Sequence, residues 1–315
     1  MKFFLLLFVF VGLARSHVIK SNSAEWEMLN KIHVDNVISP NDIDLNTIAK
    51  ETWAEIVSLC PQLPTNPRIN IHFDYLLENT TILAYASQTL HLSSNGFWIS
   101  KIYEAMIQQR NTSLGSTFDM HIAFNPYPPN GWFVHENCSN ISARYDLRTV
   151  LRHELLHGLV FAGSVREENS EWIAGYTFNG KCYPRLYDTK IKFSDNTSIF
   201  HLEGNNPLPV VGQCALRNDR SVEGADLFIG DVQLYHPYYY RPGSSISHHN
   251  YPNDLMYAST TPMVCKYIGE YEFKVLEEFG IKCNVNGMID EPSSGTKNMY
   301  LGLSYWSIII LILSY

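Results

Sequence analysis

The sequence predicts an α+β fold in which an N-terminal sheet precedes a motif-bearing helix and a loop-rich, disulfide-bonded C-terminal half. Between residues 68 and 125, short segments alternate apolar and polar residues, which is typical of strands with one buried face. From Leu147 to Val160, apolar residues recur at spacings near three and four, which is typical of a helix packed on a core. Residues 164–245 lack long periodic runs and are rich in tyrosine and proline, so we expect an irregular insertion there.

The other elements follow from the same kinds of pattern. Residues 43–59 predict a helix, because Ile48, Trp53, Ile56 and Val57 fall on its inner side. Further predicted elements are strands at residues 68–75, 81–86, 89–92 and 119–125 and a final helix at residues 266–280. The chain is 45% hydrophobic, which is enough for a substantial core, in one large domain or in two lobes around a shared cleft.

The motif-bearing helix has a good N-cap in Asp146 and a C-terminal stop in Gly163. Within it, His153 and His157 lie four residues apart and therefore on one face, with Glu154 directly after the first. Two imidazoles on one face can bind one Zn²⁺, and a glutamate at this position can take a proton from water on the metal. The pattern predicts a zinc site with His153 and His157 as ligands and Glu154 as the catalytic base.

A catalytic zinc site needs a third protein ligand and an open position. Glutamates soon after the helix are candidates, although no clear helix carries them: Glu167, Glu168 and Glu171. Two adjacent histidines, His248 and His249, are better candidates, because an Asp-Leu-Met turn that ends at Met256 follows them closely.

The motif and its continuation, HELLHGLVF at residues 153–161, together with the distant Ser-His pair and the Asp-Leu-Met turn, resemble the leishmanolysin-type metallopeptidases. The chain is also similar to secreted bacterial proteins with HELxHGLGF followed by GSSxSH, which residues 243–248 match. This resemblance covers roughly residues 119–280 and implies a metzincin-like catalytic domain with a long insertion before the third histidine. It implies that His248 is the third ligand of one Zn²⁺ and that Met256 packs beneath the metal.

Two positions depart from the pattern of those families. Gly163 stands six residues after His157, where compact metzincins place their third histidine, and glycine cannot bind a metal through a side chain. Val160 stands where the related families usually have the glycine that lets the chain turn. We therefore expect the helix to run on to Gly163.

Both ends of the chain carry targeting signals. Residues 1–16 have a basic start, an apolar run and small residues before the cut, so they predict a secretory signal peptide; the run is too short for a membrane anchor. Residues 293–315 hold small residues, a short spacer and an apolar tail, which predict a GPI-attachment signal with Ser294 as the attachment residue and Ser293 next. A short C-terminal membrane helix is the competing interpretation. Residues 17–292 would form the ectodomain, with residues 17–40 as a candidate pro-segment.

The even number of cysteines and the presence of glycosylation sequons are both typical of a secreted protein. The six cysteines predict three disulfides, with Cys265–Cys283 as a candidate pair because these two flank the final helix. The cysteines are Cys60, Cys138, Cys182, Cys214, Cys265 and Cys283. The sequons are at Asn79, Asn111, Asn137, Asn140 and Asn196. A net charge of −8 and the absence of a basic block exclude nucleic acid as a partner.

These observations predict a lipid-anchored zinc endopeptidase at the cell surface that acts on proteins or peptides. Two alternatives remain. One is a metallopeptidase-like surface glycoprotein without activity, which acts in adhesion or recognition. The other is a metal-free glycoprotein in which the histidine pattern arose by chance.

Overall fold

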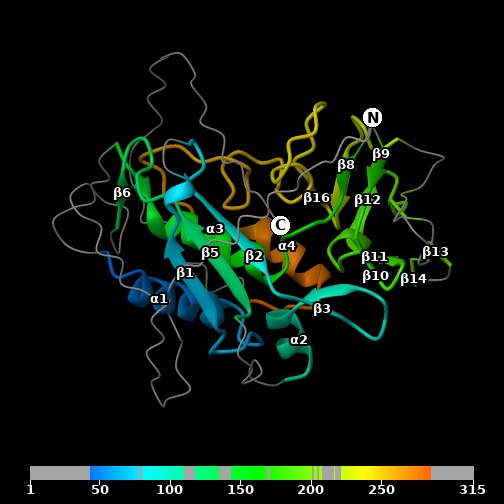
Figure 1. Cartoon of the computed structure of the whole chain (residues 1–315), viewed down its shortest axis with the longest axis horizontal. Helices are drawn as coiled ribbons and strands as arrows, with labels where there is room; N and C mark the ends of the chain where they lie inside the picture. The colour runs from blue at the N-terminus through cyan, green and yellow to red at the C-terminus, as the bar shows by residue number, and fades with distance from the viewer. Residues whose placement is uncertain are drawn as a thin grey trace, which may run out of the picture.

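The computed structural model describes residues 43–77, 80–109, 118–134, 143–168, 171–200 and 221–284, together with residues 202–203, 206–207 and 216. They form a mixed α+β structure, with the main sheet and its helices on one side and short hairpins on the other (Figure 1). The sequence predictions outside the described residues are the signal peptide, residues 17–40, the tail with Ser294, Cys138, Cys214, Asn79, Asn111, Asn137 and Asn140. In the described ranges, no helix has both the length and the apolar character needed to cross a bilayer.

The main sheet has the strand order β1-β5-β2. The central strand β5 (Met120–Phe124) runs parallel to β1 (Ile69–Phe73) and antiparallel to β2 (Ala84–Gln88). Alternate residues of β1 are buried, as expected for a strand with one face on a core. The predicted strands therefore exist, although the one expected at residues 81–86 begins later, at Ala84.

Two helices, α1 (Leu45–Leu59) and α3 (Leu147–Leu159), pack against each other and against this sheet (Figure 1). Asp146 caps α3 by accepting the backbone N–H groups of Arg148 and Thr149. Arg152 of α3 donates from Nε and Nη2 to the carboxylate of Glu55 on α1, at 3.0 Å each. Because this forked ion pair is largely buried, it fixes the rotation of α3 and so the direction in which its histidines point.

The remaining elements are short. Beside the main sheet they are β3 (Leu90–Leu92), β4 (Trp98–Ser100), α2 (Lys101–Ile107), β6 (Trp132–Phe133) and β7 (Tyr145–Asp146). The following part contains β8 (Arg166–Glu168), β9 (Glu171–Ile173), β10 (Tyr176–Phe178), β11 (Lys181–Tyr183), β12 (Ile191–Phe193), β13 (Leu202–Glu203), β14 (Asn206–Pro207), β15 (Leu227–Ile229), β16 (Val232–Gln233) and α4 (Glu270–Glu278). The described residues of the insertion thus form strands of two or three residues and one 3-10 helix, Asp188–Lys190.

The predicted ends of two helices are wrong. Helix α3 ends at Leu159 and not at Gly163, because the N–H groups of Val160 and Phe161 both bond to the carbonyl of Leu156 and the chain then leaves the helix axis. Helix α4 begins only at Glu270, and not at residue 266, because the N–H of Lys266 donates to Thr149 Oγ1 of α3 and holds that segment outside the helix.

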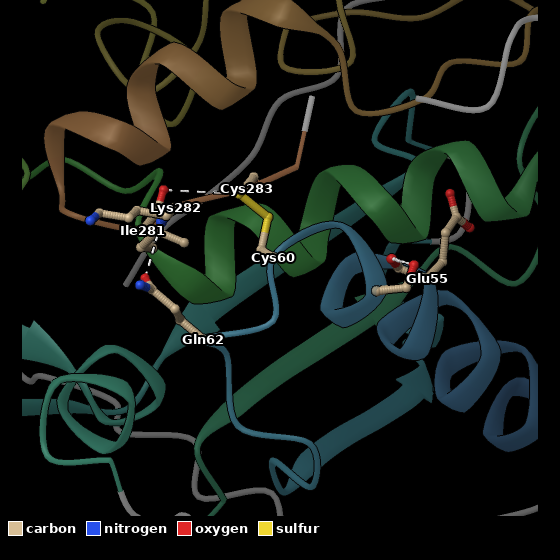
Figure 2. Close-up of a disulfide and its surroundings, with 7 residues drawn as sticks. Glu55, Cys60, Gln62, Ile281, Lys282 and Cys283 are labelled. Carbon is tan, nitrogen blue, oxygen red and sulfur yellow. Dashed lines mark hydrogen bonds between the residues drawn. A yellow bond between two sulfur atoms is a disulfide. The ribbon is translucent and has the colours of Figure 1, made fainter. Parts of the chain in front are cut away.

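The proposed Cys265–Cys283 pair is also wrong, because Cys283 is bonded to Cys60 at the end of α1 (Figure 2). Nearby, the N–H of Lys282 donates to the side chain of Gln62 at 3.1 Å, so the two chain segments lie side by side around the disulfide. Cys182 and Cys265 are disulfide-bonded as well.

Replacing Cys60 and Cys283 together with serine is expected to lower the free energy of unfolding by about 2–5 kcal/mol. The expected loss lies toward the upper part of that range, because the bond joins residues separated by 223 positions and restricts the unfolded chain strongly. Denaturant unfolding of the wild type and the double variant measures the difference. Equal midpoints and slopes would show that this bond contributes nothing to stability.

Candidate metal centre

Three histidines converge on one point in the core of the molecule. His153 and His157 project from one face of α3, and His248 comes from the segment before the Asp-Leu-Met turn. The Nε2 atoms lie 3.0 Å apart for His157 and His153, 3.1 Å for His157 and His248, and 3.2 Å for His153 and His248. The structure therefore brings the predicted ligands together.

The other ring nitrogen of each histidine faces a backbone carbonyl oxygen. His153 Nδ1 donates to the oxygen of Leu255 at 2.7 Å, and His248 Nδ1 donates to that of Ser244 at 2.8 Å. His157 Nδ1 donates to the oxygen of Phe161. A carbonyl can only accept, so each neutral ring carries its proton on Nδ1 and presents a lone pair on Nε2.

Three lone pairs at this separation cannot be hydrogen-bonded to one another, because no proton remains between them. Zinc–nitrogen bonds of about 2.0–2.1 Å in a tetrahedral site place ligands about 3.3–3.4 Å apart, only slightly farther than here. Burial lowers the pKa of His153 and His248 well below the ordinary value and that of His157 to about 4. The rings are therefore held neutral, as metal binding requires.

Glu154 completes the predicted constellation. Its side chain is fully buried, and neither carboxylate oxygen has a hydrogen-bond partner. Burial raises the pKa of this carboxyl well above its ordinary value. A buried carboxyl without a partner is costly in the core, and Glu154 directly follows the ligand candidate His153 in α3. The donor set and this orphaned group thus suit zinc.

The surroundings fix the ligands further. Gln88 of β2 donates from Nε2 to the carbonyl of His157 at 2.6 Å. Gly158 follows that histidine at the sheet, where an added Cβ would lie 2.3 Å from Met120 Sδ. A side chain at this position would force Met120 of β5 to move. Met256 is fully buried, and the residue before it, Leu255, supplies the carbonyl that orients His153.

Other predicted candidates lie elsewhere. His249 does not join the three histidines but lies near Asp254 and Glu272. The glutamates that sequence offered as alternative ligands are exposed on the β8–β9 hairpin: Glu167, Glu168 and Glu171. Among the sequons in the described residues, Asn196 is exposed, so a glycan there would extend into solvent.

Several groups that contribute to the site could not be identified from the sequence. The carbonyl oxygens of Ser244, Phe161 and Leu255 set the tautomers, yet any residue type supplies a carbonyl. The sequence placed Glu272 only in a helix, although its side chain is fully buried and this burial raises the pKa of its carboxyl. The one sequence signal for the burial of Glu272 was its position between apolar residues in a predicted helix.

Comparison with known proteins finds no relative of this chain. No family model, curated protein or solved structure matches the chain. The functional argument therefore depends on the residues and their arrangement.

Proposed function

We propose that this protein is a zinc-dependent endopeptidase with His153, His157 and His248 as metal ligands. The observation that carries the proposal is the meeting of three unprotonated Nε2 atoms within 3.2 Å of one another in a buried site. Without a cation, three inward lone pairs would be left unpaired in the core.

The chain's own groups have separate roles in this proposal. Zinc, when bound, polarises the scissile carbonyl and lowers the pKa of water at the open position. Glu154 accepts the proton of the attacking water and delivers it to the leaving amine. Burial raises the pKa of this carboxyl in the metal-free chain, so proton uptake by Glu154 is favoured relative to an exposed glutamate. The carbonyl oxygens of Leu255, Phe161 and Ser244 keep each ring in the tautomer that binds metal.

One observation favours the alternative of a metal-retaining surface protein without turnover. His153 and His157 are each 4% exposed, while His248 and Glu154 are 0% exposed. A peptide therefore reaches the site only after the groups that cover it move. If they do not move, the ion stabilises the fold and the protein acts through its surface in adhesion or recognition.

The experiment is zinc analysis of the purified full-length protein combined with cleavage of a broad peptide library. We expect zinc, cleavage that stops with a chelator such as 1,10-phenanthroline, and recovery when zinc is restored. Zinc without turnover would favour the alternative function. A protein without zinc would contradict both.

We also propose that the protein is carried through the secretory pathway to the cell surface and held there by a lipid anchor. The support is the predicted signal peptide at residues 1–16, the predicted attachment signal at residues 293–315 and the Cys60–Cys283 disulfide, since such bonds persist in oxidising compartments. Release from intact cells by a phosphatidylinositol-specific phospholipase would test it.

A further inference from the structure

A second group of ligand-type side chains lies close to the first. His249 follows His248, Asp254 lies in the turn before Met256, and Glu272 lies in α4. The Nδ1 atom of His249 is 3.5 Å from Glu272 Oε1 and 3.7 Å from Asp254 Oδ2. The side chains of His249 and Glu272 are 0% and 1% exposed, whereas that of Asp254 is 17% exposed, so the cluster is buried on two of its three sides.

These separations are too long for hydrogen bonds, which join nitrogen and oxygen at about 2.7–3.2 Å. Neither ring nitrogen of His249 has a hydrogen-bond partner, and neither does Asp254 Oδ2. Buried polar groups are normally paired, and an unpaired one costs free energy. A buried imidazole that lies within ion-pair distance of two carboxylates but hydrogen-bonds to neither points to a missing ligand.

The spacing identifies the class of ligand. Zinc bonds of about 2.0–2.2 Å place two ligands of a tetrahedron about 3.3–3.6 Å apart, whereas neighbouring ligands of an octahedron would lie about 2.8–3.1 Å apart. The separation of 3.5 Å lies within the tetrahedral range and that of 3.7 Å lies just above it, and both exceed the octahedral range. Two carboxylates and a neutral imidazole also balance the charge of a divalent cation, and a mixed nitrogen and oxygen donor set suits zinc.

We propose that His249, Asp254 and Glu272 bind a second Zn²⁺ ion, which has a structural role. Its ligands are Nδ1 of His249, Oδ2 of Asp254 and Oε1 of Glu272. This site depends on its own contacts and does not require the three-histidine site to be occupied.

The ligands are held in place by bonds that do not involve an ion. Glu272 Oε1 accepts the N–H of Met256 at 2.9 Å, and Glu272 Oε2 accepts the N–H of Gly269 at 2.8 Å. Lys266 Nζ donates to the carbonyl of Asp254 at 2.8 Å, which anchors the turn. The N–H of His249 donates to the carbonyl of Met256 at 2.8 Å. Such support is typical of metal sites, where outer contacts orient the ligands.

The second ion would support the first site. It would tie the segment from His249 to Met256 to α4, and the carbonyl of Leu255 within that segment orients His153. An ion here would therefore hold the segment that contains Leu255 in position, and with it the ring of His153.

Zinc counting in the full-length protein tests the proposal. After dialysis against metal-free buffer, we expect two zinc ions per wild-type chain and one in Asp254→Asn, which keeps the side-chain volume. His249→Ala is expected to give one as well. The matched control is Asp226→Asn, the same change at an exposed aspartate that bonds to Gln233, and it should retain two.

The outcomes also separate this proposal from the proposed function. Two zinc ions in Asp254→Asn, or a single ion in the wild type that is lost in His248→Ala, would overturn the second site and leave the first intact. A single wild-type ion that is lost in Asp254→Asn and kept in His248→Ala would overturn the first site and support the second. A wild type without zinc would overturn both.

Discussion

Replacing Glu154 with glutamine is expected to lower peptide hydrolysis by about 10²–10⁴-fold while zinc stays bound. Glutamine keeps the size of the side chain but cannot accept the proton of the attacking water, and the three histidines are untouched. Initial rates on a peptide substrate, measured together with zinc content, check this result. Wild-type turnover in the variant would remove Glu154 from the mechanism.

The control is Glu167→Gln, the same change at an exposed glutamate of β8, which should leave turnover unaltered. The stability of metal-free protein gives a second measurement. Burial raises the pKa of Glu154 above the unfolded value of 4.5, so ionisation opposes folding. The contribution of Glu154 to stability should therefore fall as the pH rises from that value through the raised pKa. The three buried histidines, whose pKa values are lowered by burial, act in the opposite direction up to pH 6.5 and are present in both proteins. We therefore expect the free energy of unfolding of metal-free wild type, relative to that of Glu154→Gln, to fall over this pH range.

Replacing His248 with alanine is expected to remove the zinc of the three-histidine site and to abolish hydrolysis. It deletes one of three ligands, so the affinity should fall by more than the roughly 10–100-fold typical of losing an outer contact. Competition with a zinc-binding dye gives the affinity. His236→Ala is the matched control, because that ring also bonds a backbone carbonyl, the one of Ala225 at 2.9 Å, but lies outside the site. Unchanged affinity and rate in His248→Ala would contradict the ligand assignment.

Local chemistry made part of the site predictable. The cap at Asp146, the apolar spacing of α3 and the four-residue interval between His153 and His157 are encoded in neighbouring residues, so the sequence indicates the helix and the face that it presents. His248 lies 91 residues after His157, and no local rule relates two such positions. Only the resemblance to known metallopeptidases selected it over His249.

Features set by distant parts of the chain were not predictable. Val160 is compatible with a continuing helix, and the stop depends on Phe161 turning so that its carbonyl meets His157. The partner of Cys283 is determined by the chain after α4, which returns to the end of α1. The spacing of the cysteines in the sequence does not indicate this contact. The ligand role of Glu272 depends likewise on where α4 docks.

The disulfide between Cys60 and Cys283 closes a covalent loop that contains most of the described residues, and the two ends of this loop lie next to each other. A protease that cuts one loop between Cys60 and Cys283 would leave both pieces joined by the disulfide, so a single cut would not release a fragment.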